Sequence, residues 1–304
     1  EFFGCDPLFR KGLYHRFLNT VLYAYTEHYM LPFSHDEVVH GKGSMLNKMT
    51  GEQEEKYDHL RMMYAYQIVH PGKKLLFMGN ELAGENEWHE NTEPEWKLLK
   101  KKKNAGMAKM ISVLNDIYQN YPALYELEEE ADGFEWINCI SADENIVVYV
   151  RKATNGDKLL VVANFAPVTR EKYKIGVPAA GKYKEIFNSD AEVYGGSGIG
   201  NKRVIPSKKE ECDGRENSIT LTVPPMSVIV LRYTEADTAE KPVAKKPAAK
   251  KETVKKETVK KAPAKKEEPA KKEAAKKAPV EKEEPAKKSP AKKEPAKKEA
   301  AKKS

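Results

Sequence analysis

The chain has 304 residues, of which 40% are hydrophobic and 33% are charged, and this length allows about two domains. Its charge is unevenly spread: residues 241–304 hold 24 Lys and 10 Glu, so they carry a net charge of +14 while residues 1–240 carry −7. No apolar run is long enough to cross a bilayer. Three widely spaced cysteines, Cys5, Cys139 and Cys212, form neither a metal-binding pattern nor a disulfide framework, which favours a reducing, cytoplasmic compartment.

The first part of the chain predicts two strand–loop–helix units. A helix is expected over residues 8–19, and an apolar strand over residues 29–33 runs into the polar cluster of residues 34–37. Thr50-Gly51-Glu52-Gln53 has the form of a capping box and predicts a helix that Pro71-Gly72 ends.

A second apolar strand, at residues 75–78, opens a polar loop that contains Trp88 and Trp96, and a helical stripe runs from Met107 to Tyr118. This alternation is typical of a parallel sheet. A (β/α)8 barrel of the TIM type needs eight such units. Residues 1–120 are therefore predicted to be the C-terminal portion of a barrel whose earlier strands lie upstream of Glu1.

From residue 121 the apolar period changes to two, as in antiparallel strands. Seven alternating runs predict strands, which are 134–136, 146–150, 159–163, 173–177, 183–187, 219–223 and 228–230. We expect residues 121–234 to form an antiparallel β-sandwich. Residues 235–304, rich in Lys, Ala, Pro and Glu, are predicted to be a disordered low-complexity tail, because they cannot bury enough apolar surface to offset ordering.

The cluster Ser34-His35-Asp36-Glu37 is the first candidate site, because the carboxyl ends of parallel strands carry the chemistry of α/β folds. The surrounding sequence, Leu31-Pro32-Phe33-Ser34-His35-Asp36-Glu37-Val38-Val39-His40-Gly41-Lys42, closely resembles the last catalytic motif of the 1,4-α-glucan (glycogen) branching enzymes, in the α-amylase superfamily. Residues 23–27, 70–79, 134–137, 188–190 and 192–198 resemble the same family. The resemblance covers residues 1–234 and stops before the tail.

The resemblance implies an enzyme that cleaves an α-1,4-glucan, forms a covalent glucosyl intermediate and transfers the chain to a 6-hydroxyl. Asp36 then corresponds to the carboxylate that holds ring hydroxyls in the transition state, and His35 to an imidazole that hydrogen-bonds the same sugar. The nucleophile and the acid/base would lie on earlier strands, so this chain is expected to be inactive alone. The family implies no metal and no organic cofactor.

Other side chains have competing interpretations. Glu37 and His40 are more simply loop-shaping residues, with Glu37 kept as a candidate sugar contact. Trp88 and Trp96 could stack on glucose, although loop tryptophans more often pin a loop to the body, and Trp136 is expected in the core. His35 and His40 are five residues apart, which does not suit a zinc protease motif, so no metal site is predicted.

Two other function classes stay open. One is a hydrolase or debranching enzyme of the same superfamily, which would release reducing ends instead of making α-1,6 linkages. The other is a non-catalytic glucan-binding protein. The basic tail could bind polyanions non-specifically by counterion release or serve only as a solubilising tail.

Overall fold

The computed structural model describes residues 1–26 and 30–235. The α-helices are α1 (Tyr14–Tyr23), α2 (Gln53–Val69) and α3 (Lys102–Asn120). Short 3₁₀ helices are η1 (Pro7–Leu13), η2 (His35–Glu37), η3 (Asn80–Leu82), η4 (Trp96–Lys100), η5 (Pro122–Leu124), η6 (Ala131–Gly133) and η7 (Glu192–Tyr194). The strands are β1 (Met30–Phe33), β2 (Lys73–Leu76), β3 (Phe134–Asn138), β4 (Ile146–Lys152), β5 (Lys158–Asn164), β6 (Arg170–Val177), β7 (Lys182–Asn188), β8 (Ile205–Pro206), β9 (Asn217–Val223) and β10 (Ser227–Thr234). The predicted tail lies outside the described residues.

Strands β1 and β2 pair in parallel, with Met30 opposite Lys73 and Phe33 opposite Leu76. Helix α2 connects them, as the sequence predicts. The Gln67 amide of α2 donates to the carbonyl oxygens of Leu31 in β1 (2.8 Å) and Leu75 in β2 (3.0 Å), so one side chain fixes the helix to both strands. Further barrel strands are not among the described residues, and the barrel stays a prediction.

Both predicted helix starts in this part are displaced. The N-cap of α2 is Glu52, whose N–H donates to the Glu55 carboxylate (2.8 Å) in a capping box. The expected pairing of Thr50 with Gln53 is therefore wrong by two residues. The helix predicted over residues 8–19 begins instead as the 3₁₀ helix η1 and becomes α-helical only from Tyr14 to Tyr23. Gly12, a weak helix former, stands just before this change.

The antiparallel region forms two sheets. Six strands pair in the order β3-β4-β5-β10-β7-β8, and β6 pairs with β9. All seven predicted strands are present, and the short strand β8 is the one that the alternation did not reveal. Ile146, Val148 and Val150 of β4 pack toward β6 and β9. Val147 and Tyr149, on the opposite face of the same strand, pack toward the helices, so both faces of the sheet are buried.

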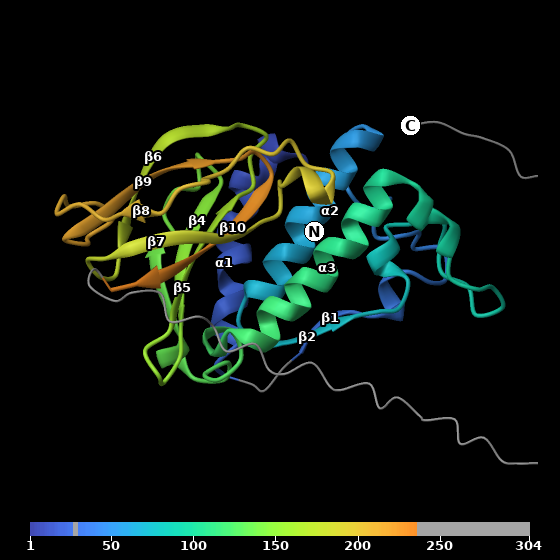
Figure 1. Cartoon of the computed structure of the whole chain (residues 1–304). Coiled ribbons are helices and arrows are strands. Elements are labelled where there is room, and N and C mark those ends of the chain that lie inside the picture. Colours follow the sequence, from blue (N-terminus) through green and yellow to red (C-terminus); the bar gives the residue numbers. More distant parts are fainter. Residues whose placement is uncertain (27–29, 236–304) are drawn as a thin grey trace, which may run out of the picture. The chain divides into compact units, whose positions relative to one another are not determined.

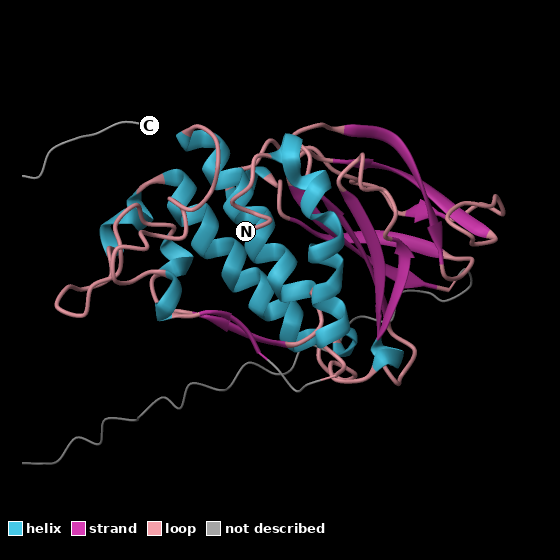
Figure 2. Cartoon of the chain, turned by 180° about the vertical axis from the view of Figure 1, so that it is seen from behind, coloured by secondary structure: helices cyan, strands magenta, loops and turns pink. Residues whose placement is uncertain are grey.

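Helix α2 is buried on almost every side, from His59 through Val69, as expected for a helix that lies inside a protein. Figure 1 shows α2 and α3 side by side, between the β1–β2 pair and the antiparallel sheet, and Figure 2 shows the same order from behind. One hydrophobic core extends from Phe2 through α2 and α3 to Val230 in β10. All described residues fall within one compact unit, Glu1–Ala248.

Candidate functional site

The predicted catalytic pair stands directly after β1. His35 and Asp36 lie in η2, whose N-cap Ser34 accepts a hydrogen bond from the Asp36 N–H (3.3 Å). The His35 Nε2 and Asp36 Oδ1 atoms are 3.4 Å apart, and their side chains are 59% and 71% exposed. Both groups are therefore held at a strand end but remain open to solvent.

The loop that follows β2 contacts this pair through the ring of Phe77. The Phe77 N–H donates to the Phe33 carbonyl (2.9 Å) and continues the strand pairing by one residue. Its ring centre is 5.9 Å from the His35 ring and 5.2 Å from Trp88. His35 therefore packs against Phe77, which in turn packs against Trp88, and both aromatic residues lie in the loop after β2.

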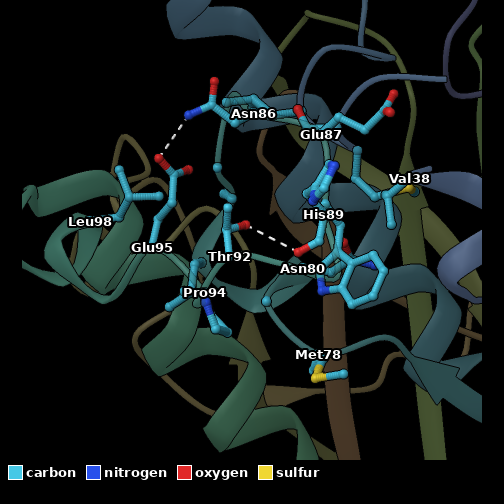
Figure 3. Close-up of a pocket in the computed structure, with 18 of the residues that line it drawn as sticks. Val38, Met78, Asn80, Asn86, Glu87, His89, Thr92, Pro94, Glu95 and Leu98 are labelled. Carbon is cyan, nitrogen blue, oxygen red and sulfur yellow. Dashed lines mark hydrogen bonds between the residues drawn. The ribbon is translucent and has the colours of Figure 1, made fainter. Parts of the chain in front are cut away.

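A pocket of about 400 Å³ opens between the loops that follow β1 and β2. Of the described residues, its lining includes Trp88 but not His35, Asp36 or Trp96. Figure 3 shows Val38 and Glu87 on one side of the pocket and Glu95 and Leu98 on the other, with the Asn86 amide donating to Glu95 (2.8 Å). The pocket and the catalytic pair are therefore neighbouring features rather than one cavity.

The candidate sugar contacts differ in their setting. Trp88 is half-buried and packs edge-on against Phe77. Trp96 is 56% exposed at the start of η4. Glu37 points toward Lys48, with 4.0 Å between carboxylate and ammonium, which suits a loop-shaping role. Trp136 is partly buried against the core, in agreement with the interpretation that it is structural.

Sequence reasoning missed two polar residues at this end of the molecule. Asn80 lines the pocket, is 9% exposed, and its Nδ2 finds no acceptor among the described residues. Glu87 accepts hydrogen bonds from the N–H groups of Gly41 (2.9 Å) and Gly43 (2.7 Å), which together lower the pKa of its carboxyl, Gly41 most. No local sequence feature of Gly41 and Gly43 identifies Glu87 as their partner, because it lies more than forty residues away.

Retaining glycoside chemistry needs two carboxyl groups about 5 Å apart around the scissile bond. The described residues supply Asp36 at the end of β1, with Glu37 turned to Lys48. The exposed carboxylate of Asp36 can accept hydrogen bonds from hydroxyl or N–H donors. In residues 1–26 and 30–235, no group of three or more His, Cys, Asp or Glu side chains is arranged to hold a metal ion. Across the same ranges, no helix combines the length and apolarity needed to span a membrane.

The chain is similar in sequence to a known domain family and to known enzymes. Residues 136–234 match the family model described as "Alpha amylase, C-terminal all-beta domain". The 1,4-alpha-glucan branching enzyme GlgB of Rhodopirellula baltica is 44% identical over 228 residues, which are 75% of this chain and 31% of that protein. The GlgB of Methylococcus capsulatus is 45% identical over 230 residues, covering 76% of this chain and 31% of its own.

The chain thus spans about a third of the length of the curated relatives it matches. Among solved structures, Eubacterium rectale Amy13B aligns with 75% of this chain and 43% of its own at 16% identity and a TM-score of 0.45, which is too low to establish a shared fold. The sequence matches confirm the resemblance to the C-terminal part of the branching enzymes and the all-β nature of the second half.

Proposed function

We propose that this chain, which is related in sequence to the 1,4-α-glucan branching enzymes over three quarters of its length, acts as the C-terminal part of such an enzyme. The activity is cleavage of an α-1,4-glucan and transfer of the released chain to a 6-hydroxyl, which makes an α-1,6 branch. The observation that carries the proposal is the His35–Asp36 pair, held on η2 at the carboxyl end of a strand in a parallel pair. Its substrate is glycogen or amylose.

In this proposal Asp36 binds ring hydroxyls of the distorted sugar more strongly in the transition state than in the ground state, which is how a non-attacking group accelerates a reaction. His35 hydrogen-bonds the same sugar and is steadied by Phe77. Trp88, on the wall of the adjacent pocket, offers an apolar ring face to a glucose unit. No step in this scheme requires a metal or an organic cofactor.

The parallel pair β1–β2 would form the last two strands of a (β/α)8 barrel. The parallel register and the connecting helix α2 support this assignment. The nucleophile and the acid/base carboxyl would come from earlier strands. For that reason the 304-residue chain alone should bind glucan weakly and should not turn it over.

The basic segment from residue 241 is a separate element of the proposal. Its 24 Lys residues would bind nucleic acid or polyphosphate through counterion release, without sequence preference. Nothing in the glucan chemistry requires it.

The decisive experiment uses the longest open reading frame that contains this sequence. Its product is incubated in parallel with amylose and with branched glycogen, and the iodine complex, new α-1,6 linkages and new reducing ends are followed together. Growth of α-1,6 linkages without reducing ends supports branching, growth of reducing ends alone indicates a hydrolase, and binding without turnover indicates a glucan-binding protein. Asp36→Asn should abolish the linkage signal, and Asp132→Asn, an exposed carboxylate in η6, is the matched control.

A further inference from the structure

The loop after η2 adopts an unusual backbone conformation. His40, Gly41 and Gly43 have φ angles of 58°, 81° and 72°, all in the left-handed region. Backbone N–H groups that converge in such a conformation form a concave anion-binding nest. The N–H groups of Gly41 and Gly43 do converge, on the two oxygens of a single carboxylate.

That carboxylate belongs to Glu87, in the loop after β2. Gly41 N–H donates to its Oε1 at 2.9 Å and Gly43 N–H to its Oε2 at 2.7 Å. Hydrogen bonds to an ionised acceptor are short and about twice as strong as neutral ones. Each oxygen accepts one backbone N–H, and these two bonds favour the ionised form and lower the pKa of the Glu87 carboxyl, so we interpret the contact as an attachment between the two loops.

Adjacent contacts fasten the same two loops. The Trp88 N–H donates to the Val38 carbonyl at 3.0 Å. The Asn47 side-chain amide donates to the Glu85 carbonyl at 2.6 Å. Glu87 and Val38 appear on the same side of the pocket in Figure 3. The loop after β2 is therefore hydrogen-bonded to residues 38–47 at several points. Of these contacts, the one made by the Glu87 carboxylate is the one that involves a charged group.

Two chains of contacts connect these loops to the candidate catalytic residues. Lys42 lies between the two glycines of the nest, and its ammonium donates to the Asp36 carbonyl at 2.6 Å. On the other side, the Trp88 ring packs on Phe77, which contacts the His35 ring. Glu87 is bonded to the residues on both sides of Lys42 and precedes Trp88 in the sequence, so a displacement of Glu87 would disturb both chains of contacts.

We propose that Glu87 is a positioning residue for Asp36 and His35: its carboxylate, seated on the backbone N–H groups of Gly41 and Gly43, latches the loop behind the pair in the arrangement that sugar binding needs. This inference rests on the proposed function for its catalytic consequence. The latch itself is a property of the chain and is tested independently of any activity.

The latch is tested first in the 304-residue chain by NMR. Glu87→Gln keeps the shape of the side chain but leaves only one acceptor oxygen, so the Gly41 and Gly43 amides should exchange with solvent about tenfold faster or more, and the Asp36 amide resonance should shift. Glu90→Gln, an exposed carboxylate in the same loop, should change none of these. Unchanged exchange at Gly41 and Gly43 in Glu87→Gln would overturn the proposal.

A chemical rescue tests whether faster exchange in a Glu87 variant comes from loss of the bound carboxylate or from a general disturbance of the loop. In Glu87→Ala, free formate can fill the empty nest, and it should restore slow exchange at Gly41 and Gly43, whereas chloride at equal ionic strength should not. Failure of formate to restore exchange, with the variant otherwise folded by circular dichroism, would show that the N–H groups do not form an anion seat.

The catalytic consequence is tested in the product of the longest open reading frame. Glu87→Gln should lower kcat about tenfold or more and change KM less than twofold, because the loss concerns the geometry of the reacting sugar. A variant with fast amide exchange but normal kcat would refute positioning. If the parent protein itself transfers no glucan, the proposed function fails, and the exchange and Asp36 shift alone decide whether the latch exists.

Discussion

Gly106, in the second turn of α3, offers a test in which two physical effects oppose each other. Replacement of a helix-interior Gly by Ala normally stabilises a protein by about 1 kcal/mol. Here, however, a Cβ at position 106 would lie 2.7 Å from both the C and O atoms of Tyr194 and 3.1 Å from its Cα. All three atoms are backbone, so no side-chain rotation relieves the contact.

The Tyr194 backbone is also held in place. Its ring stacks on Phe187 at 5.9 Å, and Arg61 donates to the Ser189 carbonyl at the start of the same segment (3.2 Å). Overpacking against a braced neighbour costs about 1–3 kcal/mol, and the upper part of that range applies where backbone must move. After the propensity gain, we expect Gly106→Ala to lower the free energy of unfolding by about 1–2 kcal/mol.

Thermal unfolding followed by circular dichroism measures this change, and a domain of this size should lose about 2–8 °C in Tm. Gly12→Ala is the matched control, because no atom lies within 4 Å of its added Cβ, and its Tm should not fall. An unchanged or higher Tm in Gly106→Ala would refute the close-approach argument and show that helix propensity dominates at this position.

Three further predictions concern the site, the buried charges and the tail. Asp36→Asn, in the product of the longest open reading frame, should lower kcat about a hundredfold or more while Tm changes little, because the exposed carboxylate acts mainly in the transition state; near-normal turnover would remove Asp36 from the site. Burial, then Arg151, lowers the pKa of Lys74 to about 7. Between pH 7 and the ordinary Lys value of 10.5 the unfolded chain therefore binds more protons than the folded one, so urea titrations should show stability rising with pH, with a smaller rise in Lys74→Met. Binding of DNA or polyphosphate should weaken steeply with salt and disappear on truncation after Tyr233, and salt-independent binding would contradict counterion release.

The regular elements were the part most open to prediction from sequence. Residues 146–150 in β4 and 159–163 in β5 are nearly continuous apolar runs, which are typical of strands buried on both faces. The runs could not reveal which elements cover each face, since that depends on the packing of distant parts of the chain. The start of α2 was misplaced for a local reason: Gly51 has a φ of 90°, and the pairing of Glu52 with Glu55 satisfies the first turn.

Only part of the candidate site was predictable from the sequence. His35 and Asp36 follow a strand and carry a recognisable motif, so sequence alone indicated them. Glu87 joins Gly41 and Gly43 across more than forty residues, and Asn80 faces a pocket built by two loops. Such pairings depend on how the two strand ends are brought together, and no periodicity or spacing encodes them.

The predicted division of the chain into a barrel part and a β domain has a physical consequence at α2. This helix contacts β1 and β2 through Gln67, and its buried residues share one core with Val161 and Val230 of the antiparallel sheet. Removal of residues 1–120 would expose the sheet face that carries Val147 and Tyr149, an apolar surface that soluble proteins keep covered. The two parts can therefore be distinct in architecture and still unfold together, because neither can bury its apolar face without the other. A single transition shared by the fluorescence of Trp88 and of Trp136, studied in single-tryptophan variants, is what this shared core requires, whereas two separated transitions would mean that each part is stable alone.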